Sequence, residues 1–496
     1  MNDLNQQNQS SKRPLILAAV MLAMFMGAVE ATIISTAMPS IVGDLGGFQY
    51  YSWVFSAYLL MNTVTILIYG KLSDLYGRKP IFTIGVVLFL LGSIGCGFSS
   101  SMPMLIAFRF LQGIGAGAVL PIATTIVGDL YSPEERAKIQ GYLSSVWGIS
   151  AVSGPAIGGI IVQSIGWPFV FFINIPIGIV SLVIVLVFLK ETNKKESIHL
   201  DKLGAILLTL SLGLFMYVIV DGGIRWGWNS GLTWLLLIFS FVLLGVFLLH
   251  ERKAKDPMMP VELWKNRSIF IANQVSFFSG LLLIGLSTFL PTYVQGVMGK
   301  SPTVAGFTLT AISIGWPIAA TIAGRLLLSL GYFTTSMIGG GALLIGTLLF
   351  FFMEPTYGPL YAGFSSFFIG VGMGFTSTAF IVTIQNSVGW EKRGVATATN
   401  LFMRNLGNTI GAAFFGGIVN FQLLRYLKDA GITNFEGVNV LFGEGTSEFS
   451  ALELSAIGEG LEVALGTVFN ILLLFALTSI IIIYFLPRRR KEREEL

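Results

Sequence analysis

The sequence has few charged residues, a single cysteine and two histidines. Only 11% of its 496 residues are charged, whereas soluble domains carry about 25%. Because Cys96 stands alone, no intrachain disulfide can form. The sequence also lacks a Walker nucleotide-binding motif, a nucleophile–base pair and a cluster of metal ligands. We therefore expect neither an ATPase site nor a catalytic centre, and no cofactor.

Apolar residues are abundant instead. Hydrophobic residues make up 54% of the chain, and the mean hydropathy is +0.78. Apolar runs of about 20 residues are typical of membrane-spanning helices. The sequence contains fourteen of them, which predicts an all-α polytopic membrane protein within the lipid bilayer. Their approximate limits are 14–36, 52–70, 81–99, 104–126, 141–163, 168–189, 204–221, 232–250, 268–293, 303–325, 332–352, 359–384, 403–421 and 464–486.

The basic residues are distributed unevenly between the connecting segments. Of the 30 lysine and arginine residues, only Arg225, Lys300, Arg425 and Lys428 fall in one set of loops. Apart from two arginines inside runs, all the others fall in the opposite loops, at the termini or at adjacent helix ends. Cytoplasmic loops carry the excess of Lys and Arg, so both termini are predicted to be cytoplasmic. The net charge of +4 gives no reason to expect a nucleic-acid partner.

Glu30 is the only carboxylate well inside any apolar run. An acid within the membrane is costly and indicates a functional site. At helical spacing Glu30 shares a face with Ala23, Gly27, Ile34 and Ala37, of which three are small. Such a face suits contact with other helices or a cavity rather than lipid. The alternative is an acid near the helix end that extends to the water interface.

Three short motifs recur at nearly constant offsets of 254, 252 and 257 residues. The pairs are GKLSDLYG at 70–77 with GRLLLSLG at 324–331, STAMP at 35–39 with STFLP at 287–291, and EER at 134–136 with EKR at 391–393. Three matches in register predict two copies of a six-helix unit in the same orientation. Parallel repeats of this kind indicate a transporter whose substrate site lies between the halves near mid-membrane.

The repeat sets the predicted domain organisation. Residues 1–190 form an N-terminal six-helix bundle, and residues 268–496 form a C-terminal one. Residues 191–267 link them and contain two inserted helices that we expect to flank the bundle. Within the second half, residues 422–463 form a long extracellular connection in which we expect a short helical hairpin.

At this level the chain resembles the major facilitator superfamily, and within it the fourteen-helix drug:proton antiporters. GKLSDLYGRK at 70–79 is similar to the superfamily's signature loop, and RFLQGIGAG at 109–117 resembles its helix 4 motif. GPAIGG at 154–159 resembles the helix 5 signature of exporters. EATIISTAMP at 30–39 and DKLG at 201–204 are similar to motifs of the fourteen-helix branch. The resemblance implies proton-coupled export of lipophilic cationic or neutral drugs across the cell membrane by alternating access.

Glu30 and Arg109 are the predicted proton-coupling residues. Protonated Glu30 is neutral and suits a closed site, whereas ionised Glu30 attracts a lipophilic cation, so a proton and a drug can compete for it. The family links the arginine of the helix 4 motif to proton coupling, and Arg109 takes that place; an interfacial arginine is the alternative. The chain departs from the family in having Glu30 where Asp is usual. It also has Leu328 in the second signature loop at the place of Asp74.

Gating is assigned to the cytoplasmic ends of the helices. Asp74 is expected to face the N-terminus of the helix at 403–421, where a carboxylate is stabilised by about 0.3–1 kcal/mol. Arg78 has Asp129 as its expected partner. Glycine and proline in the fifth run allow close, bent packing that seals the halves. The residues assigned to this packing are Gly154, Pro155 and Gly158.

Substrate contacts are assigned to polar and aromatic residues that can face a cavity, because aromatic rings attract cations. The predicted substrate-binding residues are Glu30, Trp53, Gln112, Trp147, Asn174, Tyr293 and Trp316, with Phe171, Gln385 and Asn400 as further candidates. We expect a monomer with small-molecule drugs and protons as partners. Two alternatives stay open: a dedicated exporter of one antibiotic, amino acid or lipid, and a membrane sensor that does not transport.

Overall fold

The computed structural model describes residues 12–131, 133–189, 201–254, 261–389, 393–432, 441 and 450–487. Within these residues every regular element is helical, and 13 helical segments are long and apolar enough to cross a membrane. The predicted fifth span corresponds to α6 (Pro133–Ile165), in which the apolar described part is the shorter stretch Ser153–Ile165. The chain is therefore an all-α, multi-pass membrane protein.

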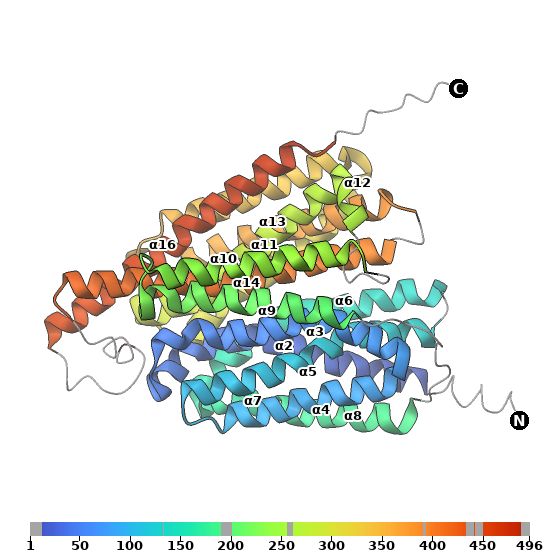
Figure 1. The fold of residues 1–496 in the computed structure, drawn as a ribbon, viewed down its shortest axis with the longest axis horizontal. Coiled ribbons are helices and arrows are strands. Elements are labelled where there is room, and N and C mark those ends of the chain that lie inside the picture. Colours follow the sequence, from blue (N-terminus) through green and yellow to red (C-terminus); the bar gives the residue numbers. More distant parts are fainter. Residues whose placement is uncertain are drawn as a thin grey trace, which may run out of the picture. The chain divides into compact units, whose positions relative to one another are not determined.

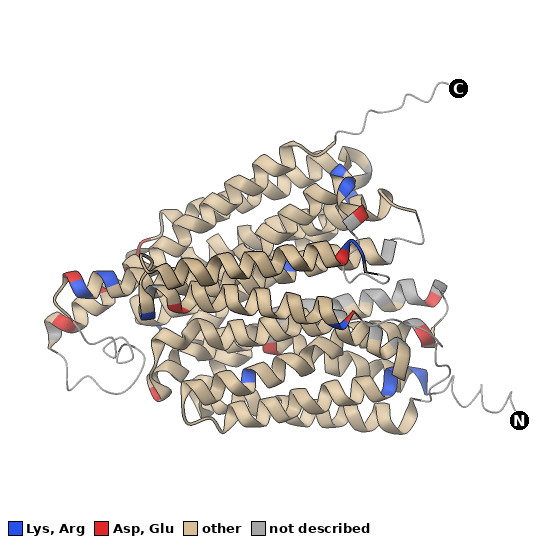
Figure 2. Cartoon of the chain, viewed as in Figure 1, with Lys and Arg blue, Asp and Glu red and all other residues tan. Residues whose placement is uncertain are grey.

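The helices divide into two compact units. The described residues of the first lie within 1–258, 301–303 and 436–448, and those of the second lie within 259–300, 304–435 and 449–496. The inserted helices thus group with the first unit. Charged residues lie mainly towards the helix ends, with few along the middle of the helices, as Figure 2 shows.

The first unit is built from nine α-helices of the described residues (Figure 1). They are α2 (Arg13–Leu45), α3 (Tyr51–Tyr76), α4 (Arg78–Gly97), α5 (Met102–Leu130), α6 (Pro133–Ile165), α7 (Pro168–Phe172), α8 (Asn174–Phe188), α9 (Lys202–Asp221) and α10 (Gly231–Glu251), with short turns η1 (Phe48–Tyr50) and η2 (Gly222–Trp226). Helix α5 packs against both α3 and α4, and α2 packs against α6 and α8.

Small residues allow α5 to approach its two neighbours closely. A Cβ on Gly92 of α4 would lie 2.6 Å from the backbone of Gln112. On the opposite side, a Cβ on Gly113 would lie 2.5 Å from the backbone oxygen of Tyr58 on α3. Because glycine has no side chain at either contact, α5 lies close to both α3 and α4. The helix 4 motif is therefore enclosed between these two helices, with Arg109 and Gln112 in the interior.

The inserted helices α9 and α10 pack on each other, and α9 packs on α3. Asp201 caps α9 by accepting a hydrogen bond from the Gly204 amide at 2.8 Å, and its Oδ1 lies 2.7 Å from His250 Nε2 on α10. Burial acts to raise the pKa of Asp201, but the Gly204 and His250 contacts outweigh it and hold that pKa below its usual value. Much of the apolar surface of α10 is exposed, including Trp234 and Phe241, as expected of a helix facing lipid.

The second unit contains five α-helices among the described residues. They are α11 (Arg267–Thr292), α12 (Pro302–Phe351), α13 (Gly358–Asn386), α14 (Arg393–Asp429) and α16 (Ala451–Tyr484), with short turns η3 (Val261–Lys265), η4 (Tyr293–Val297) and η5 (Pro355–Tyr357). Helix α12 covers two predicted spans, which are separated at Gly331 by a left-handed backbone (φ 75°). Glycine adopts that conformation without steric strain.

The predicted connection 422–463 is helical at both ends. Helix α14 continues to Asp429, and α16 begins at Ala451 behind a capping box formed by Ser450 and Glu453. The Tyr426 hydroxyl donates to Glu459 at 2.9 Å, so the two extensions lie side by side (Figure 1). Residues 433–440 and 442–449 lie outside the described part of the chain.

Candidate functional site

A buried ion pair joins α2 and α5 in the first unit. Arg109 Nη1 donates to Glu30 Oε1 at 2.5 Å, and the side chains of Arg109 and Glu30 are 1% and 0% exposed. The two residues predicted to couple protons are thus in direct contact, while their coupling role stays a prediction. A lone charge at this depth would be costly, so each group compensates the other.

Three neutral side chains extend the hydrogen bonds of the pair. Asn174 Nδ2 on α8 donates to Glu30 Oε2 at 2.7 Å, and Arg109 Nη1 also donates to Gln112 Oε1 at 2.7 Å. Gln112 Nε2 in turn donates to Ser93 Oγ on α4 at 2.8 Å. Each carboxylate oxygen of Glu30 therefore accepts a hydrogen bond, one from Arg109 and one from Asn174. This arrangement favours the ionised form of the carboxylate.

Arg109 has two further contacts on α3. Its Nε donates to the Val54 carbonyl at 3.1 Å, and its guanidinium carbon lies 4.1 Å from the centre of the Tyr58 ring. A cation over an aromatic face gains about 0.5–2 kcal/mol. Neither Tyr58 nor Ser93 was predicted from the sequence, since both lie in apolar runs where such residues are common packing groups.

The remaining polar residues of the α2 motif contribute to helix packing. Thr32 and Thr36 donate to carbonyls of their own helix, those of Val29 and Ile33, at 3.0 and 2.8 Å. A Cβ on Gly154 of α6 would overlap Thr32, and one on Gly158 would overlap Thr36. Gly154 and Gly158 therefore bring α6 directly against the helix that carries Glu30.

One of the contacts predicted for the gate residues is present in the structure. Arg78 Nε lies 3.2 Å from Asp129 Oδ2, as expected, and Arg78 Nη1 donates to Ser73 at 3.0 Å. Asp129 is 53% exposed, so the pair gains little stability from its charges. The Asp74 side chain lies outside the described part of the structure. The gating roles of these residues and of Pro155 stay predictions.

Trp53, one of the predicted aromatic contacts, does not join the Glu30 network described above. Trp53 lies against the inserted helix α9, with its ring 6.3 Å from Tyr217 and a hydrogen bond to Asp221. Tyr293 is buried in the second unit against Phe469, at 5.4 Å between ring centres. The side chain of Trp147 is outside the described residues. The structure thus brings together Glu30, Arg109, Gln112 and Asn174 in the first unit, where Trp53 contacts α9 instead. Tyr293 and Trp316 belong to the second unit.

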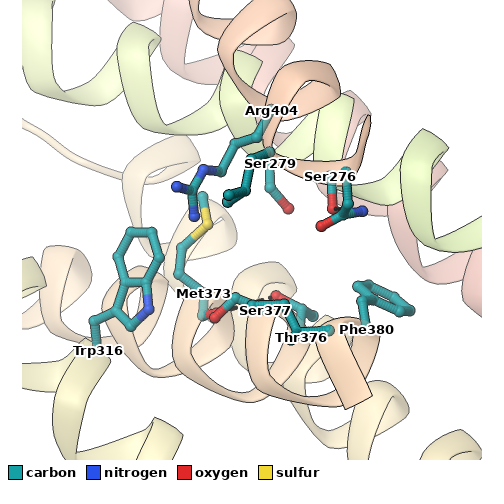
Figure 3. A pocket seen from close by; sticks show the side chains of 11 residues that line it. Ser276, Ser279, Trp316, Met373, Thr376, Ser377, Phe380 and Arg404 are labelled. Carbon is teal, nitrogen blue, oxygen red and sulfur yellow. Dashed lines mark hydrogen bonds between the residues drawn. The ribbon is translucent and has the colours of Figure 1, made fainter. Parts of the chain in front are cut away.

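A second polar feature lies inside the second unit. Figure 3 shows a pocket there. Its cavity volume is about 20 Å³, room for about one water molecule. Its lining residues are Ser276, Ser279, Trp316, Met373, Thr376, Ser377, Phe380, Ile381, Asn400, Leu401 and Arg404. Trp316 and Asn400 were candidates from the sequence, whereas Arg404 was recognised there only as an arginine within an apolar run.

Comparison with known proteins identifies the family. Residues 20–412 match the model of the Major Facilitator Superfamily. The chain is 37% identical over 447 residues to Multidrug resistance protein 3 of Bacillus subtilis (strain 168), covering 90% of this chain and 86% of that protein. It is 34% identical over 429 residues to Multidrug transporter protein MdtP of the same organism, covering 86% of this chain and 79% of that protein.

Solved structures share the fold at low sequence identity. A bacterial homologue of the human lysosomal transporter Spinster, in an inward-facing and unoccupied conformation, matches with a TM-score of 0.66 at 17% identity, covering 95% of this chain and 97% of that one. A peptide transporter POT in complex with sulfate matches with a TM-score of 0.63 at 16% identity, covering 94% of each chain. With the helical fold and the match over most of its length, the chain belongs to the Major Facilitator Superfamily.

Proposed function

We propose that this protein exports lipophilic cationic or neutral drugs in exchange for protons, by alternating access. The observation that carries the proposal is the buried Glu30–Arg109 pair with its hydrogen-bonded surroundings. The names of the two Bacillus relatives support a multidrug substrate range. On this proposal the protein is a monomer in the cell membrane with both termini in the cytoplasm, and it does not alter its substrate chemically.

Proton binding at Glu30 conflicts with its present contacts. Arg109 and Asn174 both present N–H donors to the carboxylate. A protonated carboxyl carries no charge and has less acceptor capacity, so its contacts with Arg109 and Asn174 become weaker. Protonation therefore weakens the attachment of α2 to α5 and α8. On this proposal, that weakening couples the binding of a proton to a rearrangement of helices.

Arg109 retains other partners when Glu30 becomes neutral. Gln112 Oε1, the Val54 carbonyl and the Tyr58 ring remain within reach. These groups hold the guanidinium inside the bundle, so that it can return to Glu30 once the proton leaves. In the state where Arg109 has moved away, ionised Glu30 is available to a lipophilic cation, and drug and proton compete for one carboxylate.

Uptake driven by a pH gradient into inverted membrane vesicles tests the proposal. Ethidium and the unrelated cation tetraphenylphosphonium should both accumulate when the vesicle interior is acidic, and collapse of the gradient should release them. Vesicles without the protein provide the background. Accumulation of neither cation would reject proton-coupled multidrug export and favour a dedicated exporter or a membrane sensor that does not transport.

A further inference from the structure

The contacts around Glu30 close into a ring of hydrogen bonds that passes through four helices. On one side, Arg109 Nη1 on α5 donates both to Glu30 Oε1 on α2 and to Gln112 Oε1. Gln112 Nε2 then donates to Ser93 Oγ on α4 at 2.8 Å. On the other side, Asn174 Nδ2 on α8 donates to Glu30 Oε2 at 2.7 Å and to Ser93 Oγ at 3.3 Å. All five side chains are buried, so the ring is completed at Ser93 inside the first unit.

The ion pair fixes the direction of the hydrogen bonds in this ring. Arginine can only donate, so Gln112 presents its oxygen to Arg109 and its amide N–H to Ser93. Ionised Glu30 can only accept, so Asn174 presents an N–H to it. Both sides of the ring therefore reach Ser93 with N–H groups. A serine hydroxyl has two acceptor lone pairs, so Ser93 Oγ can accept from both amides.

Asn174 divides its N–H donors between two acceptors of unequal strength. Its bond to the carboxylate is shorter than its bond to Ser93, 2.7 Å against 3.3 Å, as expected when an acceptor is charged. A protonated Glu30 is neutral and accepts more weakly, whereas the Ser93 hydroxyl is unchanged. Ser93 therefore contributes more to holding Asn174 when Glu30 carries a proton than when Glu30 is ionised.

We propose that Ser93 is a positioning residue for proton exchange at Glu30, and that it stabilises the protonated form by accepting the N–H of Asn174. This inference rests on the proposed proton-coupled export and adds a residue to its coupling site. Without Ser93, protonation of Glu30 would leave a buried Asn174 N–H poorly satisfied, which is unfavourable. Gln112 Nε2 would also lose its acceptor and would be free to donate to Glu30, which lies within its reach. Both effects oppose binding of the proton.

Glu30 is the group of this ring whose charge can change. The charged and titratable residues recorded around it are Arg109 on α5, Tyr58 on α3 and Cys96 on α4. Arginine keeps its charge in proteins. Tyrosine and cysteine ordinarily release a proton at about pH 10 and about pH 8.5, well above a carboxyl group. A carboxyl signal that is lost in Glu30→Gln therefore reports the protonation of Glu30 itself.

Infrared difference spectroscopy of the purified full-length protein in detergent, recorded between pH values, tests this inference. The C=O stretch of a protonated carboxyl group is assigned to Glu30 by its absence from Glu30→Gln, and its intensity against pH gives the midpoint of protonation. In Ser93→Ala we expect this midpoint to fall by about half to one pH unit, the equivalent of one hydrogen bond. Ser93→Thr retains a hydroxyl and should titrate as the wild type does.

Three further variants separate the ring from general packing, and thermal melting verifies that each is folded. Asn174→Leu removes a donor that stabilises the ionised carboxylate, so the midpoint should rise. Ser93→Cys keeps a side chain of similar size with a weak acceptor, and its midpoint should fall as in Ser93→Ala. Ser181→Ala is the matched control. Ser181 is buried on α8 and donates to the Ala19 carbonyl of α2 at 2.7 Å, outside the ring, so its loss should leave the midpoint unchanged.

A midpoint in Ser93→Ala that equals or exceeds the wild-type value would overturn the inference. So would an equal fall in Ser181→Ala, because the cause would then be looser helix packing. Absence of a titrating Glu30 band would reject proton exchange at Glu30 and this inference with it.

The titration needs no transport, so its outcome is separate from that of the uptake assay. A lower midpoint in Ser93→Ala together with failed cation uptake into vesicles would keep the positioning role and reject export of these cations. Normal uptake with an unchanged midpoint in Ser93→Ala would reject the positioning role and keep proton-coupled export.

Discussion

Asn174 donates to the Glu30 oxygen that does not pair with Arg109, at 2.7 Å. This contact connects α8 to the ion pair between α2 and α5, so three helices meet at one carboxylate. Any change in the charge of Glu30 must then alter helix contacts as well as electrostatics.

Glu30→Gln should abolish drug efflux driven by a pH gradient, while the protein is still expressed and folded. The amide mimics the protonated carboxyl but cannot release a proton. Efflux of ethidium from cells or vesicles at imposed pH gradients measures the effect. Glu354→Gln, at an exposed acid, is the control and should behave as wild type. Normal, gradient-dependent efflux by Glu30→Gln would remove Glu30 from the mechanism.

The Glu30–Arg109 pair should show strong coupling in a double-mutant cycle of stability. Removal of one partner of a buried pair destabilises proteins by about 3–5 kcal/mol, because the other charge stays buried and uncompensated. Arg109→Gln should therefore lower the melting temperature, and Glu30→Gln/Arg109→Gln should recover part of the loss. Thermal melting of the purified single and double variants in detergent measures the coupling between the two residues. Simple additivity of the two single effects would contradict the buried contact seen here.

Asp74→Asn should slow turnover more than it weakens substrate binding. The carboxylate is predicted to stabilise the inward-closed state, so its loss shifts the conformational equilibrium without changing the drug site. Transport rates in vesicles and equilibrium dye binding in detergent separate the two effects. Lys79→Gln, in the same loop, is the control. If binding collapses while conformational exchange is unchanged, the gate assignment is wrong.

Rigid dications should be exported poorly compared with monovalent dyes. Glu30 can balance one charge, and a second charge at mid-membrane costs at least about 2.5–3.5 kcal/mol. At about 1.4 kcal/mol per tenfold, this amounts to roughly two orders of magnitude in affinity. Competition of matched mono- and bis-quaternary dyes for ethidium efflux measures the difference. Equal export of both would mean that another acid, such as Asp44, Asp221 or Glu354, joins the site.

Asp201→Ala should destabilise the inserted helices. The substitution removes the cap of α9, worth about 1 kcal/mol, together with the contact to His250 on α10. Asp201→Asn retains a capping oxygen and should lose less. Because the pKa of Asp201 is lowered on folding, its contribution is present above the ordinary carboxyl pKa of about 4 and is lost as the pH falls through the lower folded value.

Melting of the three proteins at pH 7 therefore measures the contribution of Asp201 in full, and the difference should shrink in acid. An Asp201→Ala protein that melts at the wild-type temperature at pH 7 would show that the cap and the His250 contact do not stabilise the folded chain.

The sequence by itself determined the membrane architecture, because bilayer thickness imposes long apolar runs and a charge inside them is costly. The same physics singled out Glu30, and the repeated motifs indicated two related halves. Gln112 and Asn174 could be proposed because polar groups in apolar runs need partners, although their partners could not be assigned. Trp53, in contrast, was a plausible substrate contact from its position in the sequence, yet in the structure it lies against α9.

Only the tertiary structure decided which groups meet. Ser93 and Tyr58 reach the Glu30 network because α4 and α3 pack closely on α5 at Gly92 and Gly113, and such crossings depend on contacts between residues far apart in the chain. Arg404 was visible in the sequence, but the absence of a carboxylate from its described surroundings was not. A charge and its partner can come from any two helices, so burial and pairing are properties of the packed helices rather than of the sequence of either one.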